Sequence, residues 1–278
     1  MASHPEIVVR ALTWNLFHGR DHPPEPSLHT WRSRLLGRTE LGRTHAQVNR
    51  PLLASFAGVV AGWDWQVALL QEAPPRWRRP LARASGAGGA TALTSRNFLA
   101  PFRAALAERN PDLIASNEGG SNLILARPPF RITATERVTL ARRPERRRLL
   151  LARLESPAAR LAVANVHLSV SSTGRGPSEA VVAAGQAVAF AGGDPLLFGG
   201  DLNLRPSRER GAFDELHDRF GLAPPTSAQA IDHLLVRGLV PLEPPRACPA
   251  EAREVAGPAG LRVRLSDHAP VTASFGLR

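Results

Sequence analysis

Short apolar runs recur along the chain, and most of them end in a polar residue. Runs rich in Val, Ile and Leu predict buried strands over residues 7–14 and 65–70. Further short runs, separated by Gly, Pro and charged residues, predict strands over residues 112–116, 122–126, 130–140, 147–154, 161–168, 196–199, 231–236 and 269–275.

Between these runs the apolar residues follow helical spacing in three places. The predicted helices cover residues 51–62, 97–109 and 177–192. Pro51 suits a first helical turn, and Ser178 is the expected N-cap of the third helix. Residues 17–44 predict a long loop with one short helix, and residues 85–94, rich in Gly, Ala and Thr, predict a flexible loop.

The order of these elements predicts the fold class. Strands interleaved with a few helices indicate an α/β layered sandwich with mixed sheets and not a regular doubly wound unit. The chain of 278 residues shows no internal repeat and no interdomain linker, so we expect a single domain over residues 1–278. No Gly-x-Gly-x-x-Gly follows the first strand and no Gly-Lys-Ser/Thr loop occurs, which excludes dinucleotide-binding and P-loop proteins.

Composition limits the compartment and the metal chemistry. No stretch approaches the roughly 20 apolar residues of a membrane span, and the N-terminus has no signal-peptide pattern. The single cysteine, Cys248, can form neither an intramolecular disulfide nor a multi-cysteine metal site. We therefore expect a soluble, cytoplasmic monomer whose metal chemistry would use oxygen ligands.

The net charge of +11 favours a polyanionic partner such as nucleic acid. The chain contains no lysine, so all 35 basic residues are arginines. Because Ala, Gly, Pro and Arg are abundant throughout, compositional bias with a solvated basic surface is an equal alternative.

Polar residues of a particular kind follow the predicted strands. Each one alone is more often a turn former or a structural histidine. Together they stand at strand ends that converge at one edge of a sheet, where binding sites are favoured. The set is Asn15, Glu72, His167, Asp201, Asn203, Asp232, Asp267 and His268.

The residue types indicate hydrolysis of a phosphate ester. Glu72, supported by Asn15 and Asp267, suits Mg²⁺ or Mn²⁺ and leaves room for a phosphate oxygen. Asp201 is placed to orient or deprotonate a water, and Asn203 to donate to a phosphoryl oxygen.

The histidines complete this set. The adjacent pairs Asp267-His268 and Asp232-His233 offer carboxylates that fix histidine tautomers, and His167 and His268 are candidate phosphate contacts. The sequence has no Gly-x-Ser-x-Gly elbow and needs no cysteine nucleophile, which favours direct attack by water.

At these residues the sequence resembles the endonuclease/exonuclease/phosphatase superfamily of metal-dependent phosphoesterases. The matching segments occur in the family's order and are Thr13-Trp14-Asn15, Leu70-Gln71-Glu72, Asn165-Val166-His167-Leu168, Gly200-Asp201-Leu202-Asn203, Ile231-Asp232-His233 and Ser266-Asp267-His268-Ala269-Pro270.

The resemblance implies a DNase I-like, four-layer α/β sandwich with two central mixed sheets and a divalent-metal-dependent phosphodiesterase activity. It implies Glu72 as the main metal ligand with Asn15 and Asp267. It also implies catalytic or substrate-binding roles for Asp201, Asn203, His167, His268 and Asp232. In this arrangement Asp232 and Asp267 orient the histidines. Asn122 resembles a family residue near the phosphate.

Two departures leave the substrate open. Only 31 positions separate Asp201 from Asp232, without the Trp-rich substrate loop of abasic-site endonucleases, and the chain has no tyrosine. Nucleic acid is the preferred substrate class because of the charge. The alternative substrates are a phospholipid head group and a small phosphoester, recognised by arginines such as Arg20, Arg142, Arg143 and Arg205. The alternative to an enzyme is a noncatalytic binding protein of the same fold.

Overall fold

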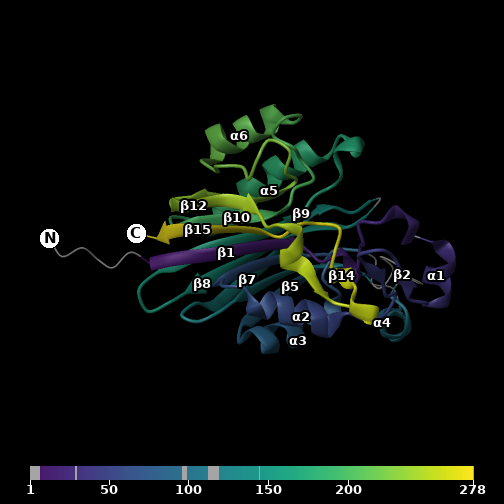
Figure 1. The fold of residues 1–278 in the computed structure, drawn as a ribbon. Helices are drawn as coiled ribbons and strands as arrows, with labels where there is room; N and C mark the ends of the chain where they lie inside the picture. Colours follow the sequence, from purple (N-terminus) through teal and green to yellow (C-terminus); the bar gives the residue numbers. More distant parts are fainter. Residues whose placement is uncertain (1–6, 29, 96–98, 112–118, 144, 278) are drawn as a thin grey trace.

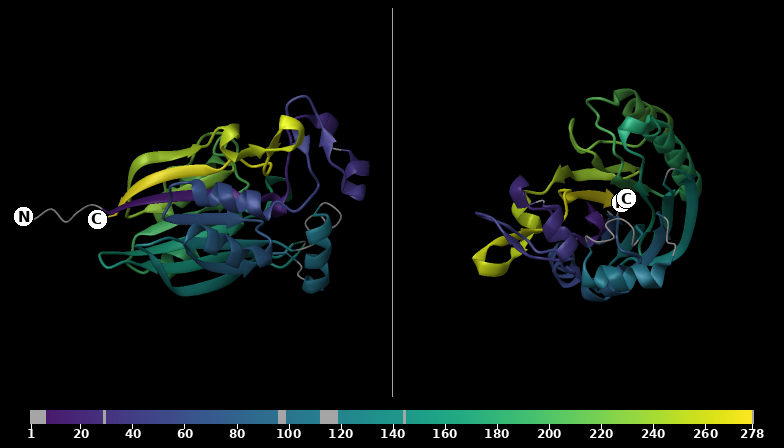
Figure 2. Two further views of the ribbon diagram at one scale, coloured as in Figure 1. Left: turned by 60° about the horizontal axis from the view of Figure 1, so that its bottom comes forward. Right: turned by 90° about the vertical axis from the view of Figure 1, so that its right-hand side faces the viewer.

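Two β-sheets pack face to face at the centre of the molecule, and helices cover both outer faces, giving four layers (Figures 1 and 2). The computed structural model describes residues 7–28, 30–95, 99–111, 119–143 and 145–277. One outer layer contains α2 (Leu53–Gly62) and α3 (Arg78–Ser85). The other contains α5 (Gly176–Ala191) and α6 (Arg210–Phe220).

Both central sheets mix parallel and antiparallel strands. The six-stranded sheet has the order β12 (Val240–Ala247), β15 (Val271–Leu277), β1 (Ile7–Asn15), β4 (Val67–Gln71), β6 (Ser121–Ala126) and β5 (Gly88–Leu93). The five-stranded sheet has the order β11 (Asp232–Arg237), β10 (Leu196–Asp201), β9 (Arg160–His167), β8 (Arg147–Glu155) and β7 (Arg131–Ala141). Strand β1 runs parallel to β4, and β9 runs parallel to β10. The predicted α/β sandwich with mixed sheets is confirmed.

The remaining elements lie mostly at one end of the sandwich. Helix α1 (Trp31–Leu36) and helix α4 (Ala100–Arg109) project beyond the sheets at the right-hand end of Figure 1. Two small antiparallel pairs join β2 (Glu40–Leu41) to β3 (Ala46–Gln47) and β13 (Glu254–Ala256) to β14 (Arg262–Arg264).

The apolar runs form three layers of core. In β1, Val9 and Ala11 face the other sheet, while Leu12 and Trp14 pack on the side of α2. This alternation follows from the two-residue period of a strand, and burial on both faces makes the run continuously apolar. A third cluster joins the five-stranded sheet to the small side chains of α5 and to α6.

Several local predictions need correction. Residues 88–93 form β5 and not a flexible loop; its glycines, alanines and threonine give little hydrophobic signal, but its backbone pairs with β6. Ser178 is not the N-cap of α5, because the helix begins two residues earlier and the Ser178 hydroxyl donates to the carbonyl oxygen of Arg175. Helices α3 and α6 and strand β12 were not predicted.

Other predictions are confirmed or lie outside the description. The short helix predicted within residues 17–44 is α1. The strand predicted over residues 112–116 lies outside the described residues. No described helix has the length and apolar character needed to cross a bilayer. The single domain stays a prediction.

Candidate active site

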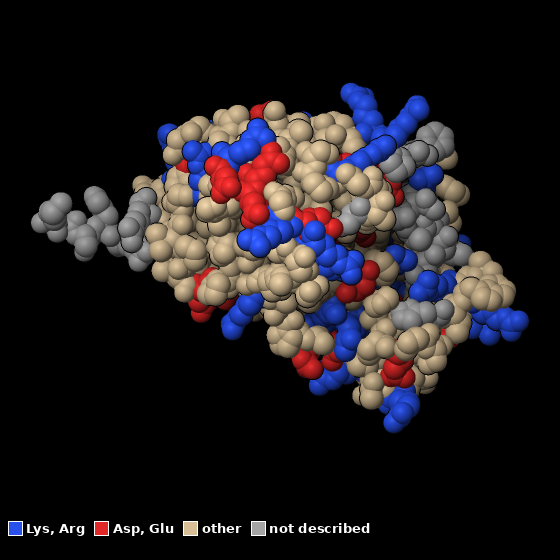
Figure 3. All heavy atoms as spheres, turned by 90° about the horizontal axis from the view of Figure 1, so that it is seen from above, with Lys and Arg blue, Asp and Glu red and all other residues tan. Residues whose placement is uncertain are grey.

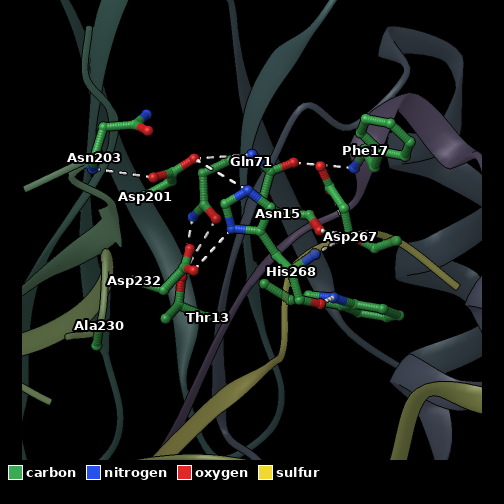
Figure 4. A network of polar contacts seen from close by, with 12 residues as sticks. Thr13, Asn15, Phe17, Gln71, Asp201, Asn203, Ala230, Asp232, Asp267 and His268 are labelled. Carbon is green, nitrogen blue, oxygen red and sulfur yellow. Dashed lines mark hydrogen bonds and ion pairs between the residues drawn. The ribbon is translucent and has the colours of Figure 1, made fainter. Parts of the chain in front are cut away.

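The ends of the parallel strands bring the predicted polar residues together. Asn15 ends β1 beside Gln71, the last residue of β4. His167 ends β9 and pairs in register with Asp201, the last residue of β10. Because the sheets face each other and both parallel pairs end at the same end of the sandwich, Asn15 and Asp201 meet between them (Figure 4). His167 Nε2 also lies close to the Asp201 carboxylate.

Two glycines let Asp201 approach its neighbours closely. A Cβ on Gly199 would lie 2.4 Å from the carbonyl oxygen of His233, and one on Gly200 would lie 2.1 Å from that of Val166. Gly200 also has φ +129°, which side chains rarely adopt. The Gly-Gly sequence is therefore required for β10 to fit between β9 and β11.

Asp201 is the meeting point of the site. Its Oδ2 accepts a hydrogen bond of 3.0 Å from Asn15 Nδ2, and its Oδ1 accepts one of 3.1 Å from the backbone N–H of Asn203. The same Oδ2 lies 3.4 Å from His167 Nε2 and 3.9 Å from His268 Nε2. Four predicted residues from separate segments thus surround one carboxylate.

His268 is held by Asp232. Its Nδ1 lies 2.8 Å from Asp232 Oδ2, which leaves Nε2 directed toward Asp201. Burial alone would lower the pKa of His268, but the charges of Asp232 and Asp201 outweigh it and raise the pKa to about 10. His268 is therefore an imidazolium at neutral pH.

Burial acts differently on the two groups facing His268. It raises the pKa of Asp201 to about 7, and Asp232 adds to the shift, while the charge of His268 and the hydrogen bond from Asn15 oppose it. Burial lowers the pKa of His167 well below its usual value, helped by nearby Arg147. At neutral pH His167 is uncharged, and Asp201 is poised to exchange a proton.

Glu72 follows β4 in a left-handed conformation, with φ +48°. Its Oε2 lies 3.1 Å from His18 Nε2, and its Oε1 lies 3.8 Å from His167 Nε2. Burial lowers the pKa of His18, against the opposing charge of Glu72. His18 was not predicted. It is one of three histidines in the loop of residues 17–44, so residue type was the signal that could have indicated it.

The other predicted residues occupy less central positions. Asn203 lines the cavity, with φ +53°, and its Nδ2 donates to the carbonyl oxygen of Leu168. Asp267 is exposed and borders a separate, smaller depression of about 250 Å³ beside His268. Asn122 is fully buried outside the cavity lining and donates to the carbonyl oxygen of Arg148 at 2.7 Å.

Asp232 pairs with His268 and not with its neighbour in the sequence. The ring of His233 points the other way, with Nδ1 accepting from the N–H of Thr226 and Nε2 lying 3.1 Å from the carbonyl oxygens of Leu204 and Ala230. Successive residues of a strand face opposite sides of a sheet, so adjacency in the sequence does not pair them.

A cavity of about 920 Å³ opens over these side chains. Its floor contains Asn15, Glu72, His167 and Asp201. The rest of the lining is rich in cationic groups and includes Arg20, Arg103, Arg146 and Arg147. The cavity therefore combines a carboxylate-rich floor with walls suited to an anion.

The residues present fit a divalent cation. The Glu72 side chain is 20% exposed at the cavity floor, with the Asn15 amide and the Asp201 carboxylate nearby. Carboxylate and amide oxygens with open space for water are the donors that Mg²⁺ and Mn²⁺ prefer. Asp201, Asp232 and His268 also have atoms within 4.8 Å of one another, but His268 in its cationic form has no lone pair to offer a metal.

This fold and site together define a protein of the DNase I-like phosphoesterase class. The model of the Endonuclease/Exonuclease/phosphatase family matches residues 12–268, so the chain belongs to that family. A search of curated proteins gives no match.

Solved structures show the same fold at low sequence identity. A family member from Bacteroides thetaiotaomicron is 14% identical with a TM-score of 0.64, over 99% of this chain and 100% of that one. A mannosyl-6-phosphatase from the same organism is 14% identical with a TM-score of 0.63, over 96% and 99%. A humanized TDP2 of D. rerio is 15% identical with a TM-score of 0.60, over 96% and 98%.

Proposed function

We propose that the protein is a divalent-metal-dependent phosphodiesterase that hydrolyses its substrate by direct attack of water. The observation that carries this proposal is the position of Asp201, which contacts or faces Asn15, Asn203, His167 and His268. A buried carboxylate surrounded by hydrogen-bond donors at a cavity floor is suited to hold and deprotonate a water.

Asp201 is the proposed base. With a pKa raised to about 7, its carboxylate is partly ionised at neutral pH and basic enough to accept a proton from the attacking water. The new P–O bond forms as the ester oxygen on the opposite side of phosphorus departs. Asn15 holds the carboxylate in place through its hydrogen bond to Oδ2.

The histidines are the proposed phosphate contacts. His268 is cationic, because Asp232 stabilises its second proton, and it would stabilise negative charge on the phosphoryl oxygens. His167 is neutral and can donate one hydrogen bond. The side-chain amide of Asn203, which lines the cavity, is proposed for the same role.

Glu72, Asn15 and Asp267 are the proposed ligands of Mg²⁺ or Mn²⁺. When bound, such a cation polarises the phosphoryl group and neutralises charge on the departing oxygen. Glu72 is the best supported of the three, because its carboxylate lies at the cavity floor between His18 and His167.

A metal-supplemented substrate screen tests the proposal. The wild type with Mg²⁺ or Mn²⁺ should hydrolyse at least one of plasmid DNA, single-stranded DNA, RNA, bis-p-nitrophenyl phosphate, sphingomyelin and inositol phosphates. EDTA should remove this activity. Glu72→Ala should remove it as well and weaken Mn²⁺ binding measured by calorimetry, while the exposed control Glu251→Ala should change neither.

Failure of the wild type on every substrate would favour the noncatalytic binding protein.

The substrate class is a separate question. The net charge supports nucleic acid, but many arginines are engaged within the fold. Arg127 donates to the carbonyl oxygens of Ser85, Trp63 and Ala61. The face in Figure 3 also intersperses arginines with acidic residues.

Two alternatives to nucleic acid therefore stay open. A small phosphoester is supported by the relative named as a mannosyl-6-phosphatase. A phospholipid is supported by the exposed apolar side chain of Val170 in the cavity lining. Cytoplasmic location and a monomeric state stay predictions.

A further inference from the structure

Exposed apolar side chains are concentrated at one end of the molecule. Among the described residues, nine large apolar side chains are exposed, and six of them belong to α1, β2 and the segment of α4. They are Trp31, Leu35, Leu36, Leu41, Leu99 and Phe102, which we call the apolar rim. Large apolar side chains left exposed at one end of a fold point to an interaction site there.

Helix α1 has the reverse of the usual pattern for a surface helix. Trp31 is 68% exposed, and Leu35, one helical turn later, lies on the same side. The residue facing inward is the small polar Ser33, whose hydroxyl donates to the carbonyl oxygen of Thr30. The helix thus turns its largest apolar side chains to solvent, which core packing does not explain.

The two helices of the rim form one surface beside the cavity. Asn110, at the end of α4, donates through Nδ2 to the carbonyl oxygen of Arg34 in α1 at 2.6 Å. Phe102, 63% exposed, precedes Arg103, which lines the cavity. Figures 1 and 2 show α1 and α4 projecting at the same end of the sandwich.

The charges around the rim select its partner. Residues 31–43 contain four arginines and one acidic residue, Glu40, which accepts a hydrogen bond from the Thr30 hydroxyl. In α4, Glu108 is paired with Arg76, leaving Arg103 and Arg109 as the cationic residues of the helix. Tryptophan, leucine and phenylalanine among arginines match the interface of an anionic bilayer, where rings sit at head-group depth and guanidinium groups meet phosphates.

We propose that the apolar rim docks onto an anionic lipid bilayer and presents the cavity to phospholipid head groups. The docking is independent of catalysis, whereas the choice of a phospholipid substrate rests on the proposed function. A second protein copy or a protein partner would need no such excess of arginine around the apolar residues.

Vesicle sedimentation tests the docking. Asp201→Asn in EDTA, which removes catalysis, should sediment with vesicles of phosphatidylserine and phosphatidylcholine and much less with phosphatidylcholine alone. Adding Trp31→Ser and Leu35→Ser should lower the partition coefficient on the order of a hundredfold, because two large apolar side chains no longer enter the interface. Adding Val182→Ser and Leu242→Ser, exposed on α5 and β12, is the matched control and should change it little.

The outcomes separate docking from catalysis. The Trp31→Ser/Leu35→Ser change in the wild-type background should leave thermal unfolding and hydrolysis of water-soluble bis-p-nitrophenyl phosphate unchanged, while hydrolysis of vesicle phospholipid falls. Equal sedimentation of the rim and control variants would overturn the docking. The docking would also be overturned if analytical ultracentrifugation showed a dimer that the Trp31→Ser/Leu35→Ser change dissociates and the control change does not. Lack of activity on every ester alongside intact vesicle binding would remove only the proposed function.

Discussion

Two groups in this protein combine histidines with carboxylates but differ in their hydrogen-bonding arrangements. The cavity group consists of His167, Asp201, Asp232 and His268. The structural group consists of Glu25, His45, Glu254 and Arg264. Of the two groups, only the cavity group contributes side chains to the lining of the cavity.

In the structural group the polar side chains bind one another and their neighbours within the fold. His45 Nε2 lies 3.0 Å from Glu254 Oε1, and its Nδ1 lies 2.8 Å from the Thr44 hydroxyl. Glu254 also accepts two hydrogen bonds from Arg264, at 2.9 and 2.7 Å. The group joins the end of the long N-terminal loop to the β13–β14 pair, so its role is to stabilise the fold.

In the cavity group the arrangement is incomplete. Asp232 Oδ1 is buried and has no hydrogen-bond partner among the described residues, and His268 Nε2 lies 3.9 Å from Asp201, beyond hydrogen-bonding distance. Buried charges left unsatisfied cost stability, and a fold retains them where they serve a site. Residue type alone therefore does not distinguish a site from a structural cluster; the position of His167, Asp201 and His268 in the lining of the cavity does.

The largest effect is expected from Asp201→Asn. The amide cannot accept a proton from water, so kcat should fall by about 10³-fold or more on any substrate found by the screen. Thermal unfolding should be nearly unchanged, since a buried carboxylate is replaced by a neutral group of the same shape. An inactive variant that also unfolds well below the wild type would instead assign Asp201 to the structural group.

A smaller effect is expected from Asp232→Asn. Without the Asp232 carboxylate, the pKa of His268 should fall, because burial still lowers it while the largest raising charge and its hydrogen bond are lost. A smaller cationic fraction of His268 should lower kcat about a hundredfold while KM changes less. The steady-state parameters at pH 7 measure this split. A loss confined to KM would show that His268 binds the ground state and does not act during the reaction.

The matching change in the structural group, Glu254→Gln, should act on stability. Its side chain is 4% exposed, and the amide would leave His45 or Arg264 without a full partner. The expected cost is about 2 kcal/mol in the free energy of unfolding, measured in urea. Activity at 25 °C should be close to that of the wild type, and a loss of kcat similar to that of Asp232→Asn would erase the distinction between the groups.

The sequence located the strand ends at which several candidate residues lie, for a physical reason. Apolar runs covered on both faces are easy to recognise, and Asn15, His167 and Asp201 end such runs. His18 lies beyond the first strand in a tight turn with φ +52°, where no periodic pattern indicates its direction. Its contact with Glu72 depends on a tertiary fold that brings two separate loops together.

The same reasoning explains the missed elements. Strand β12 has three prolines among its eight residues, which suppress a strand prediction, and the fold tolerates them because β12 is an edge strand. In α6 the apolar spacing of Ala212, Phe213 and Leu216 was present but lay among charged residues. The apolar rim could not be predicted, since only the fold reveals which leucines stay exposed.

The smallest effect concerns the pH dependence of the structural group. The pKa of Glu25 is lowered to about 2, because its carboxylate accepts hydrogen bonds from the backbone N–H groups of Arg43 and Thr44 and from the Thr44 hydroxyl. A carboxyl group whose pKa is lower in the folded state stabilises the fold above its unfolded pKa, near 4.5, and loses that contribution as the pH falls toward 2. Glu25→Gln should therefore unfold at a slightly lower temperature than the wild type at pH 6, and the difference should narrow between pH 4.5 and 2. A difference in Tm that stays constant over this range would mean that the ionised carboxylate is not what holds residues 43–45, and the loop would then depend on His45 and Glu254 alone.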